Sequence, residues 1–368
     1  MSTTLVVVLV GCLAAASCAL LGVFLVLRKM AMMADAISHA ILPGLVVGYF
    51  IARGPNLLSG FLGAAAAGIL TVTLVELLTR SGRVKEDAAI GLVFPALFAL
   101  GTFLISRFFS NVHLDADAVL FGEIAFAPFD RLIVAGYDIG VQPVWVLGTL
   151  TVVNLVFVVT LYKELKLATF DSALAATLGF SPALIHYALM TLVSLTTVGA
   201  FTAVGAILVV ALLIVPPATA YLLTDRLPVM IGLSVLAGVL AAIGGYLLAS
   251  TLNASISGAM ATVAGVLFGL ALLLSPHYGL VANMRRRHSQ RRQFAAEMLI
   301  VHLFNHAGQP EQAEESTAGH LQSDLLWTEQ FADMAIRQAT RSGLILRSGD
   351  DLQLTATGQQ QASQAVLR

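Results

Sequence analysis

The chain has 368 residues, of which 58% are hydrophobic and only 11% are charged. This composition excludes a soluble globular protein of this size, because the polar side chains are too few to cover its surface. It indicates instead an all-α protein that crosses a membrane several times.

Apolar runs long enough to span a bilayer, about 17–25 residues each, recur through the first three quarters of the chain. Nine runs meet this length: 4–27, 32–52, 57–78, 88–106, 143–162, 184–200, 203–223, 228–251 and 258–275. Eight spans is the alternative, because glycines and the Thr196-Thr197 pair within 184–223 are also compatible with a short or re-entrant helix. The predicted fold class is therefore a polytopic membrane protein with eight or nine transmembrane helices.

Basic residues are distributed unequally between the connections. With nine spans, one set of connections carries eleven lysines and arginines and the opposite set carries only Arg53, Arg107 and Arg131. Because basic connections stay in the cytoplasm, this bias predicts an external N-terminus and a cytoplasmic C-terminus. Glu76 and His186 fall near the cytoplasmic ends of spans, where headgroup contacts are the expected environment.

Asp35 and His39 are a polar pair inside the second apolar run. On a helix they share a face, with β-carbons about 5–6 Å apart, near enough for both to bind one divalent cation. An ionised side chain at bilayer depth costs at least about 2.5–3.5 kcal/mol and usually marks a polar pathway. Mixed oxygen and nitrogen ligands suit Mn²⁺, Zn²⁺ or Fe²⁺. The structural alternative makes Asp35 a helix cap near Arg28 and Lys29, with His39 hydrogen-bonded to a neighbouring helix.

Prolines interrupt two of the predicted spans. Pro43 and Gly44 follow one turn after His39 and predict a helix break, which at membrane depth is found where backbone lines a cavity or a binding site. Pro216 and Pro217 interrupt a later span and, as a bare pattern, indicate a kink.

A short helix is predicted between the fifth and sixth spans, over 170–179. Asp171 is placed as its N-cap and Gly179 as its C-terminal stop. Such a helix is either an interfacial loop or a segment that docks into a cytoplasmic partner.

Residues 109–123 form a polar connection on the predicted outer side. His113, Asp115 and Asp117 alternate, so they share one face only if the segment is extended. The two interpretations are a solvated acidic loop and a metal entrance that contacts a metal-delivering protein.

The chain changes character after residue 280. We predict a transmembrane domain over 1–280, a basic linker over 281–292 that lies at anionic headgroups, and a small α+β cytoplasmic domain over 293–368. Two strand-like runs around Gly349-Asp350-Asp351, followed by a short helix, resemble the wing of metal-responsive repressors. Four arginines against nine acidic residues from 293 onward argue against DNA binding and favour a protein-contacting appendage.

Five motifs together resemble the membrane permeases of the ATP-binding-cassette (ABC) importer family for manganese, zinc and iron. They are MADAISHAILPG at 33–44, KEDAAIG at 85–91, LFGEI at 120–124, YKEL…FD…LG at 162–179 and ALLIVPPATA at 211–220. The resemblance covers about residues 1–280. Pro217 stands where alanine is common in the family, and the C-terminal domain is present in only some members.

The resemblance implies specific roles for the segments singled out above. Asp35 and His39 would line the translocation path and coordinate the metal. The segment 170–179 would be the coupling helix that contacts a separate ATPase, through Phe170, Asp171, Leu174, Leu178 and Gly179. The chain itself would be a non-catalytic permease of the bacterial inner membrane without a permanently bound cofactor. Its partners would be the ATPase, an extracytoplasmic metal-binding protein and a second permease copy or paralogue.

The four lysines independently exclude ATP hydrolysis by a P-loop, because none follows a glycine as a Walker A motif requires. An ATP-driven importer subunit is therefore the expected function. The alternatives are a membrane-bound metal sensor with a winged-helix output domain and a metal transporter driven by an ion gradient.

Overall fold

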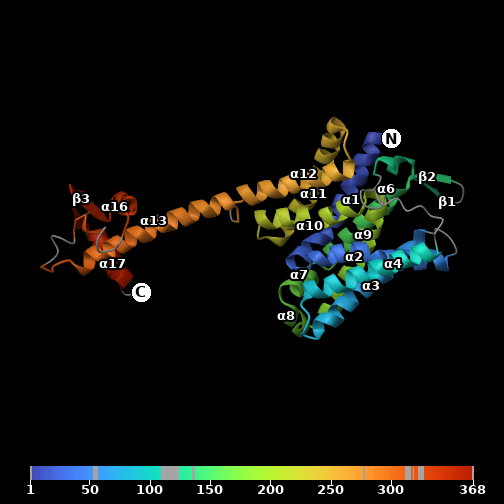
Figure 1. Ribbon diagram of the computed structural model, residues 1–368, viewed down its shortest axis with the longest axis horizontal. Coiled ribbons are helices and arrows are strands. Elements are labelled where there is room, and N and C mark those ends of the chain that lie inside the picture. The colour runs from blue at the N-terminus through green and yellow to red at the C-terminus, as the bar shows by residue number, and fades with distance from the viewer. Residues whose placement is uncertain are drawn as a thin grey trace. The chain divides into compact units, whose positions relative to one another are not determined.

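The computed structural model describes residues 2–52, 57–108, 124–134, 137–276, 278–310, 316–317, 319–321 and 327–366. The chain divides into two compact units, Met1–Ser275 and Pro276–Arg368 (Figure 1). The division falls five residues before the predicted boundary at 280. The predicted linker 281–292 lies inside a continuous helix, α13 (Leu280–Asn305), which belongs to the second unit.

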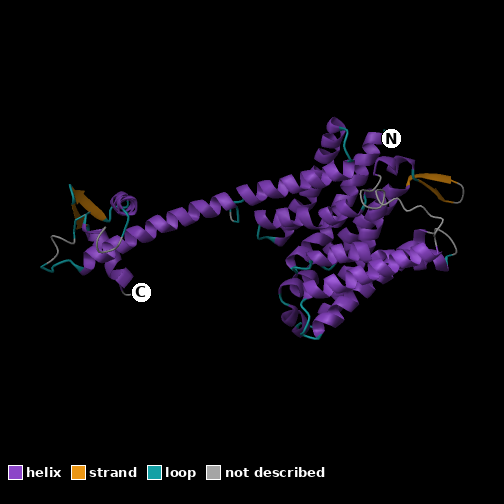
Figure 2. Cartoon of the chain, viewed as in Figure 1, coloured by secondary structure: helices purple, strands orange, loops and turns teal. Residues whose placement is uncertain are grey.

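The first unit is built from long apolar helices (Figure 2). They are α1 (Thr3–Leu27), α2 (Ala31–Ile51), α3 (Leu57–Arg80), α4 (Glu86–Phe108), α6 (Gln142–Thr160), α9 (Pro182–Val204), α10 (Ala206–Leu223), α11 (Leu227–Leu252) and α12 (Ile256–Leu274). Among the described residues, these nine helices are long and apolar enough to cross a membrane. The predicted class of polytopic membrane protein is confirmed, with the larger of the two span counts.

Gly205 resolves the uncertain segment 184–223 into two helices. Its φ of 83° lies in the left-handed region that glycine adopts without a steric penalty, so α9 ends and α10 begins around this one residue. Thr196 and Thr197 are buried inside α9 and do not interrupt it.

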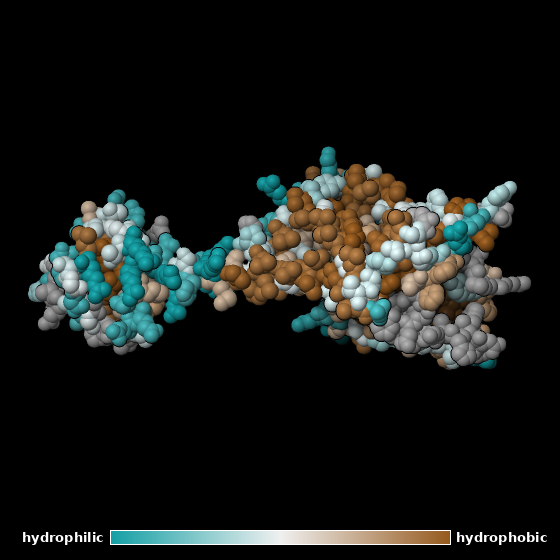
Figure 3. Space-filling view, turned by 90° about the horizontal axis from the view of Figure 1, so that it is seen from above, coloured by the Kyte–Doolittle hydropathy of each residue, from teal (hydrophilic) through white to brown (hydrophobic). Residues whose placement is uncertain are grey.

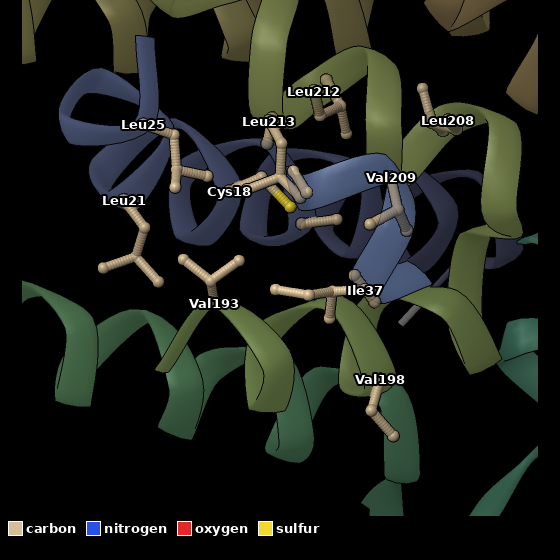
Figure 4. Close-up of a cluster of buried hydrophobic side chains, with 14 of the residues drawn as sticks. Cys18, Leu21, Leu25, Ile37, Val193, Val198, Leu208, Val209, Leu212 and Leu213 are labelled. Carbon is tan, nitrogen blue, oxygen red and sulfur yellow. The ribbon is translucent and has the colours of Figure 1, made fainter. Parts of the chain in front are cut away.

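Helix α1 lies at the centre of the unit and packs against α6, α9, α10 and α11. Figure 4 shows the apolar cluster in which side chains of α1, α2, α9 and α10 meet. Polar groups also join the helices there: the Asn154 amide donates to the Ser17 carbonyl (3.2 Å) and to Thr196 Oγ1 (2.9 Å), and Ser17 Oγ lies 3.1 Å from Thr151 Oγ1. Such hydrogen bonds hold helices together where no water competes.

Helices α2 and α3 approach each other through small residues. A Cβ on Gly44 would overlap the carbonyl oxygen of Gly63, and one on Gly48 would overlap that of Ser59. Gly44 and Gly48 thus form a small-xxx-small contact of the kind that lets transmembrane helices pack closely. This differs from the predicted break: α2 continues through Pro43 and Gly44. The glycine serves close packing on α3 instead of ending the helix. Helix α10 likewise continues through Pro216 and Pro217.

A short β-hairpin precedes α6. Strands β1 (Arg131–Val134) and β2 (Tyr137–Val141) pair antiparallel after the 3-10 helix η1 (Ile124–Phe129). Arg131 donates to Asp138 across the hairpin at 2.6 and 2.9 Å. These hydrogen bonds, with one from the Gly140 amide, hold the pKa of Asp138 below its ordinary value.

The second unit has its own core, beneath a surface that is largely hydrophilic (Figure 3). It contains α13, α16 (Glu329–Arg341), the antiparallel pair β3 (Ile345–Ser348) and β4 (Asp351–Leu354), and α17 (Ala356–Val366). Gly349, with φ of 66°, makes the turn between the strands, and Thr355 Oγ1 accepts from the Gly358 amide at the start of α17. The predicted small α+β unit is confirmed.

Replacing Gly44 by valine should destabilise the first unit by about 1–3 kcal/mol, because the added side chain forces α2 away from α3. The measurement is the thermal unfolding midpoint of the purified protein in detergent. Gly265→Ala is the matched control, since no atom lies within 4 Å of a Cβ placed there. An unchanged midpoint for Gly44→Val would contradict the role assigned to this contact.

Candidate functional site

Asp35 and His39 lie one helical turn apart near the start of α2. His39 Nε2 is 3.6 Å from Asp35 Oδ1, and the side chains are 28% and 40% exposed, respectively. The neighbouring Ser38 hydroxyl donates a hydrogen bond to the backbone carbonyl of Asp35 at 2.7 Å and not to the Asp35 carboxylate. Both metal-capable groups are therefore accessible on the same face of one helix.

The His39 imidazole packs against two aromatic rings of α4. Its ring centroid lies 5.3 Å from that of Phe94 and 6.1 Å from that of Phe98. These contacts limit the orientations of the imidazole and provide an apolar wall beside the polar pair. Within the part of the chain that the structure describes, no group of three or more His, Cys, Asp or Glu side chains is gathered to hold a metal ion. The pair alone thus supplies two ligands.

The predicted entrance residues His113, Asp115 and Asp117 lie outside the described residues. Their expected role stays a prediction.

The segment 170–179, predicted as a coupling helix, begins at the last residue of α7 (Tyr162–Phe170) and contains the short helix α8 (Ser172–Thr177). Asp171 is the N-cap of α8, and its Oδ1 accepts from the Leu174 amide at 2.9 Å. Gly179 follows the helix with φ of 87°. The predicted cap and stop are confirmed.

Large apolar side chains on this segment face outward. Phe170, Leu174 and Leu178, which we call the coupling patch, are 62%, 46% and 58% exposed, whereas Ala175, the residue after Leu174, is buried. The segment is thus held to its own unit through Ala175 and exposes large apolar side chains, as interaction surfaces commonly do.

A cluster of polar side chains lies beside the segment and was not anticipated from the sequence. Glu76 of α3 is its centre: its carboxylate lies 3.0 Å from His186 Nε2, accepts from the Tyr187 hydroxyl at 2.7 Å, and is 3.6 Å from Arg80. We call these four residues, with Arg28, the Glu76 cluster. The headgroup environment expected for Glu76 and His186 is thus replaced by partners within the protein.

Arg28 connects this cluster to the coupling segment. Its Nη1 lies 3.5 Å from His186 Nδ1, and its Nε donates to Thr169 Oγ1 in the last turn of α7 at 3.1 Å. A guanidinium that donates to Nδ1 requires the imidazole proton on Nε2, which faces Glu76. Arg28 also caps the C-terminus of α1, three residues before α2 begins. The residue therefore joins the coupling segment to the beginning of the helix that carries Asp35.

Sequence comparisons identify the class of protein to which this architecture belongs. Residues 1–275 match the family model described as the ABC 3 transport family. The chain is 46% identical over 355 residues to the zinc transport system membrane protein TroD of Treponema pallidum, covering 96% of both chains. It is 48% identical over 289 residues to the manganese transport system membrane protein MntD of Bacillus subtilis, covering 78% of this chain and 98% of the relative.

A solved structure, PsaBC from Streptococcus pneumoniae in complex with Fab, matches with a TM-score of 0.64 and 29% identity, over 76% of this chain and 94% of that one. The chain belongs to the ABC 3 transport family. The resemblance seen in its motifs is confirmed, and the similarity to TroD extends through the second unit as well.

Removing the cap of α8 with Asp171→Ala should destabilise this helix by about 1 kcal/mol, equivalent to about fivefold faster exchange of the Leu174 amide. Hydrogen–deuterium exchange of the segment measures the effect. Ser172→Ala, one residue further on, is the control, since the structure gives the capping bond to Asp171. Equal exchange in both variants would contradict the capping role.

Proposed function

We propose that this chain is the transmembrane subunit of an ATP-driven importer of a divalent transition-metal ion. The observation that carries the proposal is the accessible Asp35–His39 pair on α2, whose oxygen and nitrogen donors suit manganese, zinc or iron. The relatives named for zinc and manganese transport support the same substrate class. The transported ion is the cargo of this protein and needs no permanently bound cofactor.

Asp35 and His39 would form a transient binding site for the metal ion. Two protein ligands hold an ion less tightly than a closed four-ligand site, and release is as necessary to transport as capture. A second permease copy or a paralogue that presents its own pair would complete the coordination while the ion crosses. Because bound carboxylate must be ionised and bound imidazole neutral, acid should weaken binding.

Energy would come from a separate ATPase subunit. The coupling patch is the proposed docking surface, and ATP-driven closure of two ATPases would displace α7 and α8 of each permease. The proposed orientation, in a bacterial inner membrane, has the N-terminus outside and this segment in the cytoplasm. A metal-binding protein would deliver the ion on the outer side, where His113, Asp115 and Asp117 are the proposed entrance.

Arg28 is the proposed mechanical connection within this scheme. Since its guanidinium contacts both Thr169 and His186, a movement of α7 would be transmitted to the α1–α2 turn and then to Asp35 one helical turn later. The Glu76 cluster would give this connection a rigid support on α3 and α9.

Asp35→Ala and His39→Ala should each reduce metal uptake to the level of cells that lack the transporter, because each removes one of the two ligands. Uptake of radioactive manganese and zinc by cells that express the complete transporter measures this. Asp350→Ala and His306→Ala, in the second unit, are controls with matched chemistry and should retain uptake. Normal uptake by both site variants would remove the proposed site, and uptake in vesicles without any ATPase would favour an ion-gradient mechanism.

Leu174→Asp should abolish copurification of the ATPase subunit, because the interface would have to bury an unpaired charge. Leu346→Asp is the matched control, since this leucine is also exposed, at 64% against 46% for Leu174, on the β3–β4 hairpin of the second unit. Stable copurification of the ATPase with Leu174→Asp would place the docking surface elsewhere.

Arg28→Gln should separate ATP hydrolysis from transport. The variant keeps the coupling patch, so the ATPase remains bound and active in proteoliposomes, but fewer metal ions are transported per ATP hydrolysed. Arg28→Lys, which retains the charge, should restore part of this ratio. A normal ratio in Arg28→Gln would show that the α7–α1 contact does not transmit the movement.

A further inference from the structure

A basic groove in the second unit has no role in the function proposed above. It has a volume of about 340 Å³ and lies between α13 and α16. Its lining residues are Arg292, Gln330, Asp333, Met334, Arg337, Gln338 and Arg341. Arg292 comes from α13 and the other six lie on one stripe of α16, so two segments distant in the sequence build the groove together.

The groove carries an excess of positive charge that its own residues leave unbalanced. Asp333 is its one carboxylate, and it pairs with Arg337 at 2.9 Å. Within the described part of the chain, neither Arg292 nor Arg341 has a carboxylate within ion-pair distance. Two guanidinium groups therefore remain for an external anion, with two glutamine amides beside them as further hydrogen-bond donors.

The two walls are held in a fixed relation. The apolar faces of α13 and α16 share the core of the unit, through residues such as Leu299 and Ile336. On the rim, the Arg291 guanidinium lies 5.2 Å from the centre of the Phe331 ring, a cation–π contact between the same two helices. The groove is thus a preformed feature, and its arginines are brought together by the fold rather than by the basic run alone.

The basic surface also continues along α13 away from the groove. Arg285 precedes Arg292 by seven residues, which is about two helical turns, so the two side chains share a face. His288 lies between them on the same side. An anionic ligand in the groove would therefore lie beside a helix face that carries Arg285 as well as Arg292.

We propose that this groove binds the phosphate group of an anionic phospholipid. Guanidinium groups are suited to phosphate because their donors form a planar fork that matches its oxygens. The chain supplies the reason for a lipid source: α13 begins at Leu280, and the last apolar helix ends at Leu274, so few residues separate the groove's helix from a bilayer. Arg292 is about 18 Å along α13 from its first residue, so the covalent chain tethers the groove to the bilayer that the first unit spans.

Net charge disfavours duplex DNA as the occupant. From residue 293 onward the unit carries four arginines against nine acidic residues, so it lacks the broad basic face that a duplex requires. A single phosphate group needs only the few guanidinium groups gathered in the groove.

The two tryptophans of the chain allow a direct test in the full-length protein. Trp327 packs on Phe331 with ring centroids 5.0 Å apart and so reports on the groove, while Trp145→Phe removes the signal from the first unit. The probe is dihexanoyl phosphatidylglycerol, titrated into this variant in a neutral detergent with Trp327 fluorescence as the readout. We expect saturable binding that Arg292→Gln or Arg341→Gln weakens about fivefold each.

Arg347→Gln, on the β-hairpin outside the groove, is the matched control and should leave the titration unchanged. Arg292→Lys should bind better than Arg292→Gln, which separates loss of charge from misfolding. An equal response to dihexanoyl phosphatidylcholine would overturn the proposal. Equally tight binding of inorganic phosphate would assign the groove to a free anion, and arginine-dependent binding of a DNA duplex would assign it to nucleic acid; either result would overturn the lipid proposal.

Discussion

The close approach of α2 and α3 is the constraint on which the candidate site depends. Gly44 and Gly48 allow backbone to meet backbone, so α3 supports α2 from one side without large side chains between them. The opposite face of α2 then remains for Asp35 and His39, bordered by the aromatic rings of α4. A helix with two polar groups in a membrane needs such support, because the pair itself contributes little apolar packing.

Polar contacts elsewhere in the first unit also hold helices together. The Asn154 contacts join α1, α6 and α9 in the interior, and the Glu76 cluster joins α1, α3, α7 and α9 at one end of the helices. Helix α1 takes part in both groups. Two kinds of interaction therefore hold α1 in its central position. One is apolar burial along its length, and the other is hydrogen bonding, both in the interior and at one end of the helix.

Local sequence signals predicted much of this structure. Hydropathy located the nine apolar helices, and the intrinsic preferences of Asp171, Gly179 and Gly349 located a cap, a stop and a turn. The role of Gly44 could not be decided in this way, because a glycine after a proline is compatible with both a break and a close helix contact. Only the position of Gly63 on the neighbouring helix distinguishes them.

The residues of the Glu76 cluster come from three separate parts of the chain, and Arg28 also contacts Thr169 in a fourth. The i, i+4 spacing of Glu76 and Arg80 was the one local signal for it, whereas Arg28, Thr169 and His186 meet through tertiary packing alone. The Asp35–His39 pair was visible because both partners lie on one helix. Sequence reasoning thus found the site that is local and missed the contacts that connect it to the rest of the protein.

The single-residue connection at Gly205 has a consequence for how the chain can change over evolutionary time. Most connections between helices tolerate insertions and deletions, because they are loops of several residues that can change conformation. The connection at Gly205 is a single residue. The Val204 carbonyl accepts a hydrogen bond from the Ser257 hydroxyl, and the left-handed backbone of Gly205 leads directly into α10. A residue added within the first turn of α10 would rotate the rest of the helix by about 100° relative to this connection. We therefore expect few insertions or deletions at the junction of α9 and α10, so that the register between these two helices stays fixed.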